Sequence, residues 1–261
     1  METSSTTARC INSVCGTVSD AEWETRVDLA AACRLARHFG WNDTIRNHIT
    51  SRVPDAPDKY LITPMGLLWE EICASDLIKV DFDGNILSET DLFPGPAGLN
   101  FHGAILKTHS HLNSTVHVHP MDAVVVSALE EGLIYASQES LYLYGKVGYH
   151  AFEGIATESE EGPRIARDLG DKSCMIMWNH GLLTVGTSVA ESFVNMQRLV
   201  DACKIQVRLM ATGGTIRRIP REICELTARQ FLRPSTKKVF GIPDWKAYFR
   251  LAERLDPSFK Q

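Results

Sequence analysis

Two long segments of the chain carry apolar residues three or four positions apart, which is the spacing of an amphipathic helix. Each segment begins at a Ser-x-x-Glu capping box and stops at a glycine. The pattern predicts one helix between Ser19 and Gly40 and a second between Ser188 and Gly213. Shorter apolar stretches predict three further helices, at residues 64–72, 98–107 and 122–131.

Strands are predicted where short apolar runs are bounded by turn residues. The run at residues 173–178 is followed by a turn and by a returning strand over 182–185. The Asp83-Gly84 pair between two apolar runs is typical of a hairpin over residues 77–87. Further strands are expected at residues 60–63 and 115–119 and in the aromatic stretch 141–152.

Helices and strands alternate along the chain, with hairpins among them. This order predicts a single α/β domain whose central sheet is mainly antiparallel or mixed. The domain is expected over residues 20–215, after a flexible Ser- and Thr-rich tail at 1–19. Residues 216–261 are predicted to form a C-terminal extension that packs on the domain or on a neighbouring subunit.

The composition of the 261 residues is ordinary for a globular protein, with 44% hydrophobic and 23% charged residues, and excludes a disordered or coiled-coil chain. The net charge of −5 argues against nucleic acid or an anionic membrane as the main partner. The seven cysteines lack Cys-x-x-Cys spacing, so neither a disulfide framework nor a zinc knuckle is expected. Without a signal-like N-terminus, a soluble cytoplasmic protein in a reducing compartment is expected.

A pair of histidines two residues apart is the clearest chemical signal. His117 and His119 lie in a predicted strand, so both imidazoles project from the same face. His180 lies in a Gly-bordered turn after another strand, and the three rings converge if the two strands are neighbours. Three neutral imidazoles with open positions are a ligand set of catalytic zinc. By spacing alone, the alternative is that His117 and His119 are half-buried polar residues without a metal. The similar pair His109 and His111 lies in a polar stretch, which is typical of a solvated loop.

Several motifs, in order, resemble those of the class II aldolase/adducin family. They span most of the chain, from about residue 34 to 214, and comprise residues 47–52, 61–66, 76–84, 117–119 and 179–186. The resemblance implies an α/β/α layered fold and a cyclic homotetramer with active sites at subunit interfaces. It also implies a divalent metal held by His117, His119 and His180, commonly Zn²⁺, with Fe²⁺ or Mn²⁺ as alternatives.

One departure from the family pattern concerns the acid/base residue. Sugar-phosphate aldolases of the family carry Ser-Ser-Glu four residues before the histidine that corresponds to His102, and the Glu is their acid/base. This chain has Pro96-Ala97-Gly98 in that place. The carboxylate and the two serines that help to bind phosphate are therefore absent.

The loop that resembles the family's substrate loop is changed too. The Gly-Asn phosphate element is here Asn47-His48, although Gly66 is kept. Because a phosphate dianion needs a dense set of donors, a small, unphosphorylated hydroxy-carbonyl or keto-acid substrate is expected. Asn47, His48 and Gly66 are predicted to bind it. Gln138 is predicted to orient it, with a plain surface position as the alternative.

A proton must still be moved in the absence of the glutamate. Tyr149 and His150 are the predicted catalytic residues, and they alternate along a strand, so at most one faces the metal. Tyr149 packed on the sheet is an equal alternative. His48 is a further candidate, and His102 faces either the site or the core.

Three functions are compatible with these residues. The leading hypothesis is a metal-dependent lyase that cleaves or forms a carbon–carbon bond by aldol chemistry or decarboxylation. The second is a non-heme iron oxygenase that uses the same three histidines. The third is a non-catalytic binding module, as in the head region of adducin.

Overall fold

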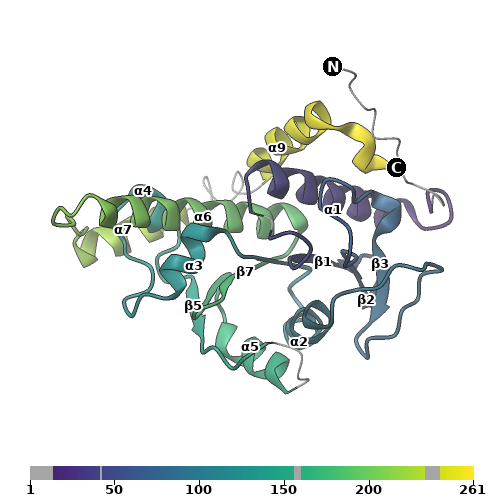
Figure 1. Ribbon diagram of the computed structural model, residues 1–261, viewed down its shortest axis with the longest axis horizontal. Helices are drawn as coiled ribbons and strands as arrows, with labels where there is room; N and C mark the ends of the chain where they lie inside the picture. Colours follow the sequence, from purple (N-terminus) through teal and green to yellow (C-terminus); the bar gives the residue numbers. More distant parts are fainter. Residues whose placement is uncertain (1–13, 42, 156–159, 233–241) are drawn as a thin grey trace.

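The computed structural model describes residues 14–41, 43–155, 160–232 and 242–261. Its centre is a seven-stranded sheet in the order β3-β2-β1-β4-β7-β6-β5 (Figure 1). Neighbouring strands are antiparallel except β5 and β6, which are parallel. The predicted α/β class with a mainly antiparallel, mixed sheet is confirmed. The strands are β1 (His48–Val53), β2 (Ala56–Ile62), β3 (Ile78–Asp81), β4 (Ser114–Val118), β5 (Val147–His150), β6 (Cys174–Met177) and β7 (Gly181–Gly186).

One face of the sheet is covered by the two long helices, and the C-terminal helix α9 lies on the outer side of these helices (Figure 1). The helix α1 is Asp20–His38 and α6 is Val189–Ala211, and each begins at a serine whose Oγ accepts a backbone N–H, as predicted. Val116 of β4 and Leu182 of β7 point to this face and share a buried cluster with Phe193 of α6. The smaller helices on this side are α3 (Met121–Ser127), α4 (Gln138–Tyr142), α7 (Arg221–Phe231) and α9 (Ile242–Leu255).

The opposite face is covered by the π-turn η2 (Gly98–His102), the helix α2 (Gly103–Thr108) that continues it, and α5 (Glu161–Leu169). Phe101 and Leu183 belong to the buried cluster on this side. Leu182 and Leu183 lie in different clusters because successive residues of a strand point to opposite faces. The molecule therefore has the α/β/α layers that the family resemblance implies.

The predicted helix at residues 64–72 is wrong. Its first residue, Pro64, makes an isolated β-bridge with Pro94, and the following stretch contains turns and no helix. Gly66 has φ +94°, a left-handed conformation that interrupts a right-handed helix. The apolar spacing of this segment reflects side chains that reach the core from a loop.

The predicted strand at residues 141–152 is only partly correct. Its first residues complete the helix α4, which Ser137 caps by accepting the backbone N–H of Ser140 at 3.2 Å. The strand β5 is confined to Val147–His150. Two predicted helices also differ in detail, because α3 ends at Ser127 and the helix at 98–107 starts as a π-turn.

The C-terminal helix α9 packs on α1 and α6. The indole Nε1 of Trp245 donates to Asp28 of α1 at 3.2 Å, and the guanidinium of Arg34 lies 3.2 Å from Asp256. The 3₁₀ turns η1 (Ala74–Asp76) and η3 (Pro257–Lys260) lie beside α1. Most of the predicted tail at 1–19 lies outside the described residues. Among the described helices, none has the length and apolar character needed to cross a bilayer.

Candidate metal centre

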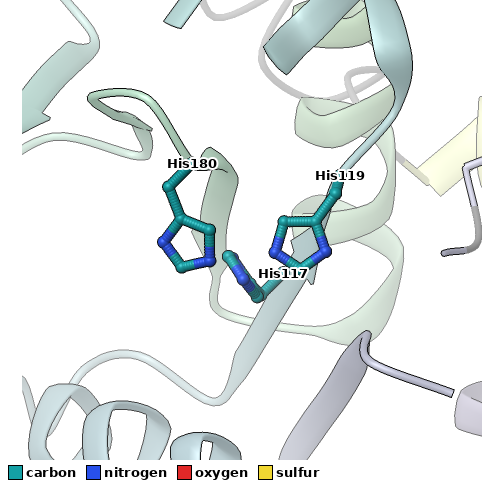
Figure 2. Close-up of side chains that lie close together, drawn as sticks. All are labelled: His117, His119 and His180. Carbon is teal, nitrogen blue, oxygen red and sulfur yellow. The ribbon is translucent and has the colours of Figure 1, made fainter. Parts of the chain in front are cut away.

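The three predicted histidine rings face one another where β4 ends and β7 begins (Figure 2). His117 lies in β4, His119 follows it, and His180 precedes β7, the antiparallel neighbour of β4. The ring centroids of His117 and His119 are 4.5 Å apart, and each lies 4.9 Å from that of His180. One nitrogen from each ring lies within 4.8 Å of the other two. The structure thus brings together all three residues.

The hydrogen bonds of these rings leave nitrogen lone pairs available. His117 Nδ1 donates to the carbonyl oxygen of Leu182 at 2.9 Å, so its Nε2 carries the lone pair. Both ring nitrogens of His119 are buried and have no hydrogen-bond partner among the described residues. A buried polar atom without a partner costs about 1–3 kcal/mol, which a ligand would recover. Imidazole lone pairs suit Zn²⁺ and related ions, so the donor set fits a metal.

The electrostatics of the cluster keep the rings neutral. Burial lowers the pKa of His117 well below its usual 6.5, and the neighbouring His119 and His180 lower it further. Burial, with His180 beside it, lowers the pKa of His119 to about 4. The pKa of His180 is also lowered, mainly by burial. Neutral imidazoles are the form that binds a metal, so the site is prepared for one at pH 7.

The turn that carries His180 depends on its two neighbours in the sequence. Asn179 has φ +56°, which Asn tolerates better than most residues, and its N–H donates to Ser127 at 2.9 Å. A Cβ on Gly181 would lie 2.7 Å from the Cδ2 of His119. Glycine at this position therefore allows the ring of His119 to approach that of His180.

A fourth histidine stacks on the cluster from β1. His48 is the register partner of His117, so both rings project from the same face of the sheet. Their centroids are 5.0 Å apart with an interplanar angle of 26°. His48 Nδ1 lies 3.0 Å from His102 Nε2, and His102 Nδ1 lies 3.0 Å from Thr50 Oγ1. His102 is thus buried with both nitrogens bonded, and it holds His48 in place.

A cavity of about 360 Å³ opens beside the three rings. Asn47 and His48 line it, and Asn47 Oδ1 accepts the backbone N–H of His119 at 3.2 Å. The Nδ2 of Asn47 is buried without a partner among the described residues, so it remains available to a ligand. Most of the other walls are apolar: Ile45, Pro64, Met65, Pro96, Ala97, Phe101, Phe152 and Ile155.

The sequence profile of the class II aldolase and adducin N-terminal domain matches residues 27–207. The chain belongs to this family. A Pseudomonas aeruginosa member, named a provisional class 2 aldolase, is 38% identical over 247 residues, which are 94% of this chain and 95% of that protein. Rat alpha-adducin is 44% identical over 192 residues, which are 72% of this chain and 26% of adducin. The family thus includes proteins named as aldolases, which have about the length of this chain, and the adducins, which are much longer.

Solved structures of class II aldolase relatives share the fold. An aldolase II superfamily protein from Pseudomonas syringae superimposes with a TM-score of 0.88 at 40% identity, covering 96% of this chain and 100% of that one. The L-fuculose 1-phosphate aldolase of Glaciozyma antarctica gives 0.80 at 26% identity, covering 92% of each chain. Class II aldolases typically depend on a divalent metal, in agreement with the donor set described above.

The place where sugar-phosphate aldolases of the family are expected to carry their glutamate is closely packed in this member. A Cβ on Gly98 would lie 2.9 Å from the Cδ1 of Ile62 and 3.1 Å from the Cγ of His48. The ring of His48 therefore fills the space into which a side chain at position 98 would extend. No described carboxylate lines the cavity.

Four other predicted site residues do not line the cavity in this single chain. The Tyr149 hydroxyl accepts the N–H of Leu133 at 3.1 Å, and its ring stacks on Trp178 at 4.6 Å. His150 points to the face of the sheet that α5 covers, the same face as His117, but its Nδ1 lies 2.8 Å from Asp168 Oδ2 and it does not line the cavity. Gln138 is exposed at the start of α4. Gly66 shapes a turn directly after Met65, which does line the cavity.

The sequence analysis missed two kinds of cavity residue. Arg46 is the only lysine or arginine among the lining residues, and it directly precedes the Asn47-His48 pair. Its position next to the Asn47-His48 motif could have identified it from the sequence. Phe152 and Ile155 contribute an apolar wall from the segment after β5, which no spacing rule connects with the histidines.

Proposed function

We propose that the protein is a metal-dependent lyase that cleaves or forms a carbon–carbon bond in a small, unphosphorylated hydroxy-carbonyl or keto-acid substrate. His117, His119 and His180 hold the cation, which we take to be Zn²⁺, with Fe²⁺ or Mn²⁺ as alternatives. The observation that carries the proposal is the pair of buried, unpartnered nitrogens of His119, facing two further neutral imidazoles. When bound there, a divalent cation supplies Lewis-acid polarisation of a substrate carbonyl.

The polar lining of the cavity supports a small anionic substrate. Arg46 provides a guanidinium at the exposed rim, where it pairs with Asp43 at 3.3 Å. A substrate carboxylate would compete with Asp43 for this guanidinium, which can bind a carboxylate with two parallel hydrogen bonds. The buried Nδ2 of Asn47 is a donor for a substrate oxygen near His119. Because no other lysine or arginine lines the cavity, the set fits one carboxylate better than a phosphate dianion.

His48 is our choice for the group that moves the proton. Its Nδ1 contacts His102, so its Nε2 is the nitrogen left to meet a substrate in the cavity. Burial lowers the pKa of His48 to about 3, and an anionic substrate beside the ring would raise it. Tyr149 and His150 have other partners in the structure, so we do not assign the proton transfer to them.

Metal analysis of the purified protein tests the first part of the proposal. We expect about one equivalent of divalent metal at the three-histidine site and its loss in His119→Ala. His111→Ala is the matched control, because His109 and His111 have the same spacing but form no metal-ligand group, and His111 is exposed. Retention in His119→Ala of as many metal equivalents as in the wild type, with the other histidines intact, would refute the assignment.

Turnover tests the second part. A panel of four- to six-carbon 4-hydroxy-2-oxo acids is incubated with metal-loaded protein, and release of the 2-oxo acid fragment is measured. We expect metal-dependent cleavage that is lost in His119→Ala and reduced about 10²–10⁴-fold in His48→Asn, the range for loss of a positioned acid/base group. Cleavage that is equally fast without metal would contradict the proposal.

The proposal extends to assembly. Family members are often oligomeric and act on small molecules, and the resemblance noted above implies a homotetramer with sites at subunit interfaces. Light scattering on the purified chain is expected to give four times the mass of 29.1 kDa. A monomer with full activity would rule out a shared site.

A non-catalytic binding role is favoured by one observation, the 44% identity to rat alpha-adducin over 192 residues. The chain spans only 26% of adducin, so the role of the longer protein does not transfer directly. Protein without bound metal and without turnover, but with a specific protein partner, would favour this alternative over the lyase.

A further inference from the structure

A second cluster of metal-ligating side chains lies between β5 and α5, outside the three-histidine site. His150 Nε2 lies 3.7 Å from Glu161 Oε1 and 4.0 Å from Glu153 Oε1. One ligand atom from each of these residues lies within 4.8 Å of the other two. The cluster shares no residue with the group formed by His117, His119 and His180.

The orientation of the His150 ring is fixed by a third carboxylate. Its Nδ1 lies 2.8 Å from Asp168 Oδ2, and a carboxylate only accepts hydrogen bonds, so Nδ1 carries a proton. The side chain of His150 is 1% exposed, and its Nε2 is buried without a hydrogen-bond partner in the described structure. In neutral His150 the Nε2 lone pair therefore points at two carboxylates, an arrangement that is repulsive unless a positive charge lies between them.

Two positive species could occupy this place, a proton on Nε2 or a metal ion. A proton on Nε2 would have no hydrogen-bond acceptor in the present arrangement, because Glu161 Oε1 lies 3.7 Å away. Ligand atoms around a tetrahedral zinc lie about 3.4 Å apart, given bonds of ~2.0–2.1 Å. The observed separations of 3.7 and 4.0 Å need only a small inward movement to reach that spacing.

We propose that His150, Glu153 and Glu161 form a second binding site for a divalent transition-metal cation, with Asp168 as the residue that orients His150. One imidazole nitrogen and two carboxylate oxygens favour Zn²⁺ or Mn²⁺ over Mg²⁺ and Ca²⁺, which prefer oxygen ligands alone. A metal-bound histidine whose other N–H donates to a carboxylate is the usual arrangement in metalloproteins.

The surroundings of the two glutamates are compatible with this role. Glu153 accepts from Arg164 Nε at 2.8 and 3.1 Å, which holds its carboxylate as outer hydrogen bonds hold metal ligands. The Glu161 side chain is 7% exposed, and burial raises the pKa of its carboxyl group. The Glu153 side chain is 31% exposed, so an ion can enter from solvent on that side.

The site has a consequence for the main cavity. Glu153 belongs to the segment after β5 whose Phe152, Gly154 and Ile155 line that cavity. Phe152 and Ile155 are 56% and 82% exposed, so their own packing holds this wall only weakly. A cation bound to His150, Glu153 and Glu161 would fasten the segment to β5 and to the first turn of α5. The second metal therefore acts on the shape of the cavity wall from a distance.

Counting bound metal tests the inference. The full chain is stripped with EDTA, dialysed against Zn²⁺ and analysed by mass spectrometry of the metal, with folding checked by circular dichroism. We expect two zinc equivalents in the wild type, one in Glu161→Gln and one in Glu153→Gln. The matched control is Glu160→Gln, an exposed glutamate adjacent to Glu161 that lies outside the cluster, and it should retain two.

The same measurement separates this inference from the proposed function. In His119→Ala, one equivalent should remain and should be lost when Glu161→Gln is added. Zinc at a hundredfold excess over its dissociation constant should raise the Tm of His119→Ala by about 5–10 °C but leave the double variant unchanged. Two results would overturn the second site. Either both glutamate variants still bind two equivalents, or the equivalent that remains in His119→Ala is not lost when Glu161→Gln is added. Neither result would contradict the three-histidine site.

Discussion

The Nδ1 of His48 and the Nε2 of His102 lie 3.0 Å apart in a buried contact, so two imidazoles share one proton position. Burial lowers the pKa of His48 to about 3 and that of His102 well below 6.5, so both rings are neutral at pH 7. One ring must donate and the other accept, and Thr50 bonded to the far nitrogen of His102 helps to decide which. The orientation of His48 in the cavity therefore depends on a residue that the substrate never touches.

Thr50→Val is expected to destabilise the protein by about 1–3 kcal/mol, because it leaves the buried Nδ1 of His102 without a partner. The register partner of Thr50 supplies the control. Thr115 is equally buried, but its Oγ1 has no hydrogen-bond partner among the described residues, so Thr115→Val should change the free energy of unfolding little. Urea unfolding followed by fluorescence compares the two, and equal losses would show that His102 does not need the hydroxyl.

Gly181→Ala is expected to weaken metal binding about 10–100-fold, because the added methyl group would lie 2.7 Å from both the Cδ2 of His119 and the backbone oxygen of Val118 and would push the ring and the turn apart. Gly95→Ala is the control, since its Cβ would make only an ordinary contact, 3.6 Å from the Sδ of Met65. Competition with a fluorescent zinc chelator measures both affinities. An unchanged affinity in Gly181→Ala would show that the close approach of Gly181 to His119 does not position the metal ligands.

The metal-free protein should lose stability as the pH falls below about 6.5. The pKa of His119 is about 4 in the folded chain and near 6.5 in the unfolded chain, so between these values the unfolded chain binds more protons. The free energy of unfolding should fall by about 1.4 kcal/mol per pH unit for each such histidine, down to about pH 4 for His119 and about pH 3 for His48.

Unfolding in EDTA at pH 7 and pH 5 provides the measurement for this pH dependence. His119→Asn should reduce the fall, whereas His111→Ala, at an exposed position, should reproduce the wild-type behaviour. If the free energy of unfolding of the wild type were the same at pH 7 and pH 5, the buried histidines would not control the stability of the protein at acidic pH.

Arg46→Gln should raise KM about 10-fold or more for a substrate with a carboxylate and change kcat little, since a hydrogen bond to a charged group contributes about 1.5–3 kcal/mol. A hydroxy-ketone of the same length without the carboxylate should show no such difference between wild type and variant. Equal effects on both substrates would place Arg46 outside carboxylate recognition.

The sequence predicts β4, β6 and β7 well because their patterns are local, whereas it does not predict β1, the other neighbour of β4. Residues 115–119 alternate between core and site, and the stop at Pro120 coincides with the end of β4 at Val118. The helix predicted at 64–72 fails because its apolar side chains reach the core from a loop held by the Pro64–Pro94 bridge. No local pattern in residues 64–72 indicates that Pro64 pairs with Pro94, thirty residues later in the chain.

The same distinction applies to the candidate site. The convergence of His117 with His119 follows from the two-residue period of a strand, and His180 needed only the assumption that two strands are neighbours. The contact between His48 and His102 depends on how the π-turn η2 lies against β1, which is a matter of packing between layers. The placement of His150 beside Glu161 depends likewise on the position of α5.

The close approach of Gly98 to His48 means that the residues at these two positions cannot be changed independently. A glutamate introduced at 98 would collide with the imidazole, so a single substitution gives an overpacked protein. Replacing His48 alone leaves a gap beside His117 and removes the partner of His102. If His48 moves the proton as proposed, replacing it with a glutamate at position 98 would therefore need both residues to change together.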